Sequence, residues 1–166
     1  KKIFKKVHNF CILNNDIALN AMKRKSISLG LKPLVISNKI SGEASLVGKV
    51  LLKTAKKGHA IIAGGETTVT VHGKGKGGRN QVLCLSALRY LKSDLIISIG
   101  SDRKDNSNHA GAISDRVTKE KAKKLKLDLG KYLHDNNSYN FFKKTKDFIE
   151  TGDTGTNIAD LILVLK

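Results

Sequence analysis

The sequence has few of the residues that usually restrict the backbone, fill the core or form disulfides in a small domain. It has no tryptophan, one proline and only 5% aromatic residues, so its core must be built from Ile, Leu, Val and Ala. Two cysteines, Cys11 and Cys84, give no disulfide framework. Both are expected to be buried free thiols, because each lies in an apolar segment.

Long apolar runs are also missing. No stretch approaches the ~20 residues of a membrane span, and no signal peptide is visible, so a cytoplasmic protein without membrane contacts is expected. The 166 residues suit one domain, or one domain plus a piece of another. The sequence begins with Lys1 rather than methionine, as expected of a fragment or of a chain that has lost its N-terminus.

Acidic residues are scarce. The sequence has 14 Asp and Glu against 31 Lys and Arg, which gives a net charge of +17 at pH 7 and a pI near 10.0. Such a charge suggests polyanionic partners such as nucleic acid. However, many of the lysines fall on the polar faces of predicted helices, and no aromatic residues are interleaved with them. A generally basic surface is therefore the favoured interpretation, and nucleic acid is not an expected partner.

The first part of the chain alternates between strand and helix patterns. Strands are predicted at 10–13, 34–37 and 60–63. Helices are predicted up to residue 29, with Asn14 or Asn15 as the N-cap and Gly30 as the stop, and over 43–57. This βαβαβ pattern predicts a parallel sheet with right-handed crossovers.

The pattern changes after Gly64. A β-branched strand is predicted at 67–71, an almost entirely apolar and buried helix at 81–91, and a central strand at 95–99. A short apolar stretch, 110–113, follows. The remaining predicted elements are a lysine-rich helix from Thr118 to Leu127, a short helix capped by Ser138, and a last strand at 161–165.

The most informative stretch runs from Gly64 to Gln81. A β-branched run leads into a loop with four glycines, 73–78, and Arg79 then opens an apolar helix. Glycine lets a ligand approach the backbone, and a helix N-terminus offers unpaired N–H groups and a positive dipole end. The stretch therefore predicts an anion site, most often one for phosphate. A glycine-rich hairpin with solvated lysines is the structural alternative.

The loop also matches G-x-G-x-x-G through Gly73, Gly75 and Gly78, and Asp102 ends the next strand. This match keeps a dinucleotide site open. The threonine-rich strand before the loop counts against it, and the three cations of the loop favour a triphosphate. These cations are Lys74, Lys76 and Arg79.

Acidic residues near the loop suggest a metal. Asp102 and Asp105 follow a strand, and Glu66 lies at a strand end, so the three are candidate ligands for Mg²⁺. Asx turns, helix caps and a surface acid are the structural alternatives. The five histidines show no metal-ligand spacing, and His72 and His109, which lie nearest the site, are expected to be solvated.

Four motifs in this order resemble the C-terminal domain of the glycerate 2-kinase family, whose members were long labelled hydroxypyruvate reductases. They are Gly64-Gly65-Glu66-Thr67-Thr68-Val69-Thr70-Val71, the loop from Gly73 to Gln81, Asn137-Ser138-Tyr139-x-Phe141-Phe142 and Thr151-Gly152-x-Thr154-Gly155-Thr156-Asn157. The resemblance covers residues 58–166, and 8–55 is similar to the last βα units of the family's N-terminal domain.

The resemblance implies transfer of the ATP γ-phosphoryl group to the 2-hydroxyl of D-glycerate, with Mg²⁺. Arg79 matches the family's active-site arginine, and Asp102 and Asp105 match acidic positions of its T-D-G-x-D-G loop, in which Arg103 here replaces a glycine. Arg79 and Asp102 are thus the expected catalytic residues. The expected nucleotide-binding residues are Gly64, Gly65, Thr67, Gly73, Lys74, Gly75, Lys76, Gly77 and Gly78.

The implied fold is α/β: a Rossmann-like βαβ segment in residues 1–57, as the C-terminal part of one domain, followed by a mixed-sheet α/β domain in 58–166. Most of the family's first domain, with its catalytic lysine, lies outside this sequence, so that domain or a partner chain is expected to be needed. A homodimer is left open.

Two alternative functions remain. One is a non-catalytic nucleotide- or partner-binding remnant, and the other is an NAD-dependent hydroxypyruvate reductase. In the kinase, Arg79→Ala is expected to weaken Mg-ATP binding or abolish transfer while leaving the fold intact.

Overall fold

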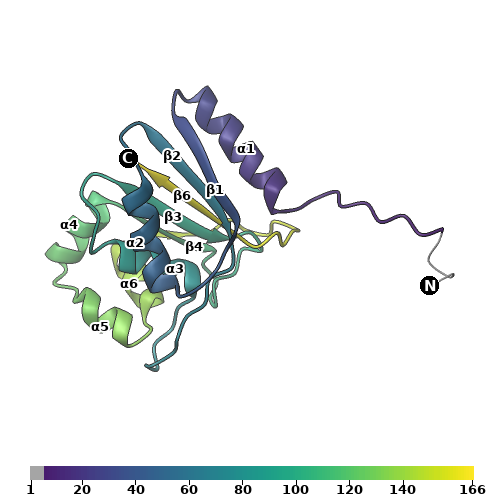
Figure 1. Cartoon of the computed structure of the whole chain (residues 1–166). Coiled ribbons are helices and arrows are strands. Elements are labelled where there is room, and N and C mark those ends of the chain that lie inside the picture. Colours follow the sequence, from purple (N-terminus) through teal and green to yellow (C-terminus); the bar gives the residue numbers. More distant parts are fainter. Residues whose placement is uncertain (1–5) are drawn as a thin grey trace.

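A single six-stranded sheet organises the computed structural model, which describes residues 6–166 (Figure 1). The strand order is β1-β2-β6-β3-β4-β5. The strands are β1 (Lys32–Ile40), β2 (His59–Gly65), β3 (Leu95–Gly100), β4 (Gly111–Ser114), β5 (Phe148–Ile149) and β6 (Asp160–Leu165). Only β1 and β2 pair in parallel; the other neighbours are antiparallel. The mixed-sheet α/β fold is therefore confirmed.

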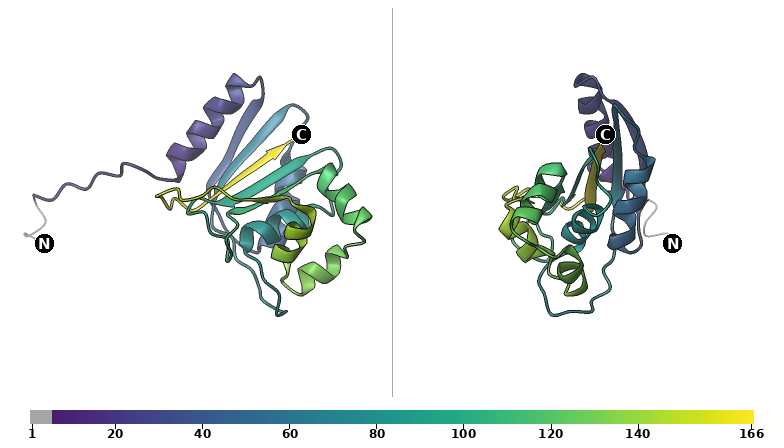
Figure 2. Two further views of the ribbon diagram at one scale, coloured as in Figure 1. Left: turned by 180° about the vertical axis from the view of Figure 1, so that it is seen from behind. Right: turned by 90° about the vertical axis from the view of Figure 1, so that its left-hand side faces the viewer.

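Six helices flank this sheet. They are α1 (Asn15–Ser28), α2 (Ala44–Thr54), α3 (Arg79–Ala87), α4 (Arg116–Lys124), α5 (Leu129–His134) and α6 (Ser138–Thr145). Alternate residues of β2 face two layers: Ile61 and Ala63 join the main core with α2 and α3, whereas Ile62 is buried on the face that α1 contacts. Figure 2 shows α4, α5 and α6 gathered at the side of the sheet away from α1.

The ends of α1 follow the sequence prediction. The side chain of Asn14 accepts a hydrogen bond from the Ile17 N–H at 3.0 Å, which caps the helix N-terminus. Gly30, just past the other end, has a φ of 74°, a conformation that glycine adopts without strain. The buried apolar helix predicted over 81–91 is present as α3, in which every residue from Asn80 to Ala87 is buried, but it begins at Arg79 and ends at Ala87.

Two predicted strands are wrong. Residues 10–13 form no strand but run as an extended segment away from the sheet, with Phe10 84% exposed, because nothing in residues 6–166 packs on them (Figure 1). The expected parallel sheet consequently shrinks to the β1–β2 pair. Residues 67–71 make only an isolated bridge between Glu43 and Thr68, and the Glu43 carboxylate accepts from the Thr70 N–H and hydroxyl, which takes the place of a ladder.

Several helix details differ from the predictions. Asp115, not Thr118, caps α4, because its carboxylate accepts from the Thr118 N–H at 2.8 Å. Ser138 is the first helical residue of α6 and Asn137 is its N-cap. Helix α5 and the short β5 were not predicted, since neither carries a clear apolar period over its six or two residues.

The expected boundary at residue 58 lies between α2 and β2, and the sheet continues across it through the β1–β2 pairing. The cysteine prediction is half right. Cys84 is buried and free, and burial raises the pKa of its thiol, whereas Cys11 is exposed because it lies in the extended segment. Among the described residues, no helix has the length and apolar character needed to cross a membrane.

Candidate functional site

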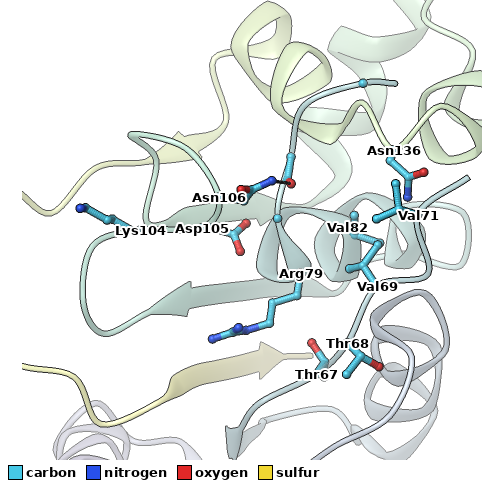
Figure 3. Close-up of a pocket in the computed structure, with 13 residues that line it drawn as sticks. Thr67, Thr68, Val69, Val71, Arg79, Val82, Lys104, Asp105, Asn106 and Asn136 are labelled. Carbon is cyan, nitrogen blue, oxygen red and sulfur yellow. Dashed lines mark hydrogen bonds between the residues drawn. The ribbon is translucent and has the colours of Figure 1, made fainter. Parts of the chain in front are cut away.

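A pocket of about 470 Å³ opens where the glycine loop meets the start of α3 (Figure 3). Thr67 and Thr68, just after β2, form one wall, and Arg79 extends from the first turn of α3 along the pocket. Of the predicted phosphate-binding residues, the pocket brings together Thr67, Gly75, Gly77, Gly78 and Arg79. Gly64, Gly65, Gly73, Lys74 and Lys76 lie outside its lining.

The glycine loop is fastened to the turn between α5 and α6. The side-chain oxygen of Asn136 accepts hydrogen bonds from the N–H groups of His72 and Gly73, at 2.6 and 2.8 Å. The Gly75 N–H donates to the Asp135 carbonyl at 2.8 Å. An added Cβ on Gly75 would lie 2.4 Å from that carbonyl oxygen, so this glycine is required by the protein's own packing.

Of the loop glycines, Gly77 leaves the least room for a side chain. A Cβ there would lie 2.0 Å from the Ser138 Oγ, a buried hydroxyl without a hydrogen-bond partner in the described structure. We expect Gly77→Ala to lower the free energy of unfolding by about 1–3 kcal/mol through overpacking. Adding Ser138→Ala, which removes the clashing oxygen, should restore much of that loss in chemical denaturation. An undiminished loss in the double variant would contradict this packing.

Gly64 and Gly65 are also required by close contacts within the protein. A Cβ on Gly64 would lie 2.0 Å from the Asn15 side chain, and one on Gly65 would lie 2.2 Å from the Ile40 backbone, while Gly65 itself has a φ of 145°. The pair therefore lets α1 and the end of β1 approach β2. Lys76 is directed to the ring of Tyr139, 4.4 Å from its centroid.

The N-terminus of α3 already binds an anion from the protein itself. Each carboxylate oxygen of Asp105 accepts twice: Oδ1 from the N–H and side chain of Asn80, at 3.0 and 3.3 Å, and Oδ2 from those of Gln81, at 2.8 and 3.0 Å. Asp105 is only 3% exposed. Burial raises the pKa of Asp105, although these donors act in the opposite direction. Asp105 thus has the geometry of a buried helix cap.

Arg79 is held by two carboxylates. Its Nε and Nη2 donate to Asp160 at 2.6 and 3.1 Å, and Nη2 lies 2.8 Å from the Glu66 Oε1. The hydrogen bond to Asp160 raises the pKa of Arg79, although partial burial opposes it, so the guanidinium stays charged. Sequence reasoning missed Asp160, which opens β6. The signal available was an acidic residue at the start of an otherwise apolar strand.

The three predicted metal ligands do not assemble. Glu66 pairs with Arg79, Asp105 caps α3, and an oxygen of Asp102 accepts from the Lys104 N–H at 3.1 Å in an Asx turn. Within residues 6–166, no group of three His, Cys, Asp or Glu side chains is placed to hold a metal ion. The described residues therefore do not bring Glu66, Asp102 and Asp105 together as one metal site.

The two histidines near the site differ. His72 is exposed, as expected, but His109 is only 2% exposed, because its ring stacks between Tyr139 and Phe148 with centroids 4.6 and 4.0 Å away. Its Nδ1 has no partner in the described structure. Burial lowers the pKa of His109. The charges that act on it are those of Glu150, Lys76 and Lys143.

The buried ring predicts acid sensitivity. A histidine pKa lowered by folding means that the unfolded chain binds the proton more tightly, so stability present above the unfolded pKa of about 6.5 is lost as the pH falls through the lower folded value. His109→Phe keeps the stacking and removes the titration, so its melting temperature should fall less steeply between about pH 7 and pH 5. The exposed His134, replaced by Gln, is the control, and an equal slope in all three proteins would refute the prediction.

Comparisons with known proteins show the family of the chain. The family model described as the MOFRL family matches residues 59–160. The chain is 35% identical over 173 residues to a glycerate 2-kinase of Pyrococcus horikoshii, covering 96% of this chain and 39% of that protein. It is 43% identical over 128 residues to a D-glycerate 2-kinase of Thermotoga maritima, covering 74% of this chain and 31% of that protein.

A solved structure gives the same result. The crystal structure of a glycerate kinase from Thermotoga maritima superposes with a TM-score of 0.92 at 35% identity, covering 97% of this chain and 42% of that one. The chain thus spans about two fifths of the length of that protein. The resemblance to the glycerate 2-kinases is confirmed over most of the chain, and the family model covers more than half of it: the chain belongs to the MOFRL family.

Proposed function

We propose that this chain is the phosphate-binding portion of an ATP-dependent glycerate 2-kinase. In that reaction the 2-hydroxyl oxygen of D-glycerate forms a bond to the γ-phosphorus of ATP and loses its proton to solvent, while the bond from that phosphorus to the β,γ-bridging oxygen breaks and ADP leaves. The observation that carries the proposal is the permanently charged Arg79 guanidinium in the wall of a pocket beside two threonine hydroxyls. The relatives named glycerate 2-kinase supply the substrate class.

The pocket residues have different roles in this proposal. Arg79 balances negative charge on the transferring phosphoryl group, an effect that grows where the charge develops in the transition state. The hydroxyls of Thr67 and Thr68 and the backbone around Gly77 orient the phosphates. In this proposal Mg²⁺ enters with the substrate as Mg-ATP, since the phosphates themselves supply ligands for it.

The site proposed here is one side of a cleft. The chain spans about two fifths of its relatives, so we further propose that a second structural unit, from the same polypeptide or from a partner, supplies the glycerate side. The boundary expected at residue 58 is not part of this proposal, because β1 pairs with β2 and α2 packs on α3 across it. A hydroxypyruvate reductase is disfavoured, since the relatives are named as kinases and Asp105 occupies the helix N-terminus that a dinucleotide pyrophosphate would need.

Calorimetric titration of Mg-ATP into the chain, with NADH as the comparison, tests the phosphate half of the proposal. Mg-ATP is expected to bind and NADH is not. Lys124→Ala, which removes an exposed positive charge on α4 away from the pocket, should bind like the wild type. A coupled assay for phosphoglycerate tests the transfer. Binding without transfer, when the second structural unit is also present, favours the non-catalytic alternative, and no binding of Mg-ATP refutes the proposed phosphate site.

A further inference from the structure

The two carboxylates that hold Arg79 lie in different environments. Asp160 has a side chain only 3% exposed, at the first position of a strand that lies between β2 and β3. The Glu66 side chain is 63% exposed and follows the end of β2. One partner of the guanidinium is therefore buried and the other is in contact with water.

Asp160 is fixed through its backbone as well as its side chain. It pairs with Gly65 on one side and with Gly100 on the other, and its carbonyl accepts from the Asn15 side chain at 3.3 Å. Its two hydrogen bonds to Arg79 form the bidentate fork that arginine and carboxylate prefer. Moving the Asp160 carboxylate away would leave a buried charge unpaired, which is strongly unfavourable.

The Glu66 side chain makes fewer contacts than that of Asp160. Its backbone N–H donates to the Ile40 carbonyl at 2.7 Å, but its carboxylate has only the 2.8 Å ion pair with Arg79 among the described residues. An ion pair with a partner this exposed contributes little and is screened by salt. Glu66 can therefore exchange for another anion at small cost, and Asp160 cannot.

The charges favour that exchange. Arg79 with both carboxylates carries a formal charge of −1, from one positive and two negative groups, which repels an incoming phosphate. Without the Glu66 contact the remaining pair is neutral, and the Nη2 N–H that faced Glu66 is free for a new acceptor.

We propose that Glu66 is a built-in stand-in for the ligand's anionic group: it holds Arg79 while the pocket is empty and yields to a phosphate, while Asp160 keeps the guanidinium in position. The ligand class is a polyphosphate, so the inference rests on the proposed function and adds how its site is gated. Glu66 thereby tunes affinity for phosphate, and Asp160 is a positioning residue.

The test is calorimetric titration of inorganic tripolyphosphate, first with a chelator and then with Mg²⁺, into the wild type, Glu66→Gln and Asp160→Asn. Glu120→Gln is the matched control, because it removes one exposed charge from an ion pair with Arg116 on α4. We expect Glu66→Gln to bind about three- to ten-fold more tightly at low salt, with the gain shrinking at high salt. Glu120→Gln should bind like the wild type.

Asp160→Asn should bind several-fold more weakly. Its positioning role is read from the nuclear magnetic resonance signal of the Arg79 Nε–H, which should exchange faster with water in this variant and remain unchanged in Glu66→Gln. Because Asp160 is buried, its variant also needs an unfolding measurement. The tripolyphosphate affinity of Glu66→Gln, a variant at an exposed residue, tests the exchange independently of the result for Asp160→Asn.

The contrary outcomes are distinct. Equal or weaker chelator-phase binding in Glu66→Gln, an equal gain in Glu120→Gln, or no binding by any variant overturns the exchange. A loss confined to the Mg²⁺ titration makes Glu66 a metal ligand and also overturns it. If Glu66→Gln gains affinity but the chain together with the second structural unit forms no phosphoglycerate from Mg-ATP and D-glycerate, the exchange stands and the proposed kinase activity fails. If the wild type transfers phosphate but Glu66→Gln gains no affinity, the proposed kinase activity stands and the exchange fails.

Discussion

Arg79→Ala is expected to lower kcat/KM for phosphoryl transfer by about a hundred-fold or more in the complete kinase, because one charged donor to the transition state is lost. It is also expected to lower the free energy of unfolding by about 3 kcal/mol, because it leaves the Asp160 carboxylate buried without its partner. The sequence alone suggested that alanine would leave the fold intact. The structure predicts otherwise through the two hydrogen bonds to Asp160.

Two further variants separate these effects. Arg79→Lys keeps the positive charge but loses the planar fork, so it should retain more stability than alanine while activity stays well below the wild type. Arg79→Ala combined with Asp160→Asn removes the uncompensated charge, so stability should partly return while activity should not. Steady-state kinetics and denaturant titrations on the same preparations provide both readouts. Wild-type kcat/KM in Arg79→Ala would show that Arg79 takes no part in transfer.

Local signals in the sequence predicted the elements that depend on local physics. Asn14 and Gly30 delimit α1 through a side-chain cap and a left-handed backbone, both of which are decided within a few residues. The run from Val82 to Leu88 is apolar except for Ser86, so its burial follows from composition. The sequence also indicates that the glycine loop needs a close approach to its backbone, although it attributes that approach to a ligand.

Contacts distant in sequence could not be predicted from such signals. Strand β6 pairs between β2 and β3, so the last strand separates two elements that are consecutive strands in the sequence. The same insertion places Asp160 beside Arg79, 81 residues away. Gly75 and Gly77 are glycines because the distant turn before α6 lies against them. A pattern of residue types shows that a close approach is needed and leaves open whether protein or ligand makes it.

Asp105→Ala is expected to lower the free energy of unfolding by about 4 kcal/mol. The change strands the N–H and amide donors of Asn80 and Gln81 in a buried site, and each buried unsatisfied group costs about 1–3 kcal/mol. Asp115→Ala is the matched control, because it removes the N-cap of α4 and should cost only about 1 kcal/mol.

Denaturant titrations measure both losses, and hydrogen exchange of the Asn80 and Gln81 amides locates the first one. Exchange there should accelerate far more in Asp105→Ala than in Asp115→Ala, because only Asp105 covers the start of α3. The opposite pattern would be equally clear. If Asp105→Ala is no less stable than Asp115→Ala but loses Mg²⁺-dependent nucleotide binding, then Asp105 is the metal ligand that the sequence predicted. In that case the cap seen here must open when Mg-ATP binds, and the helix N-terminus becomes free for a phosphate.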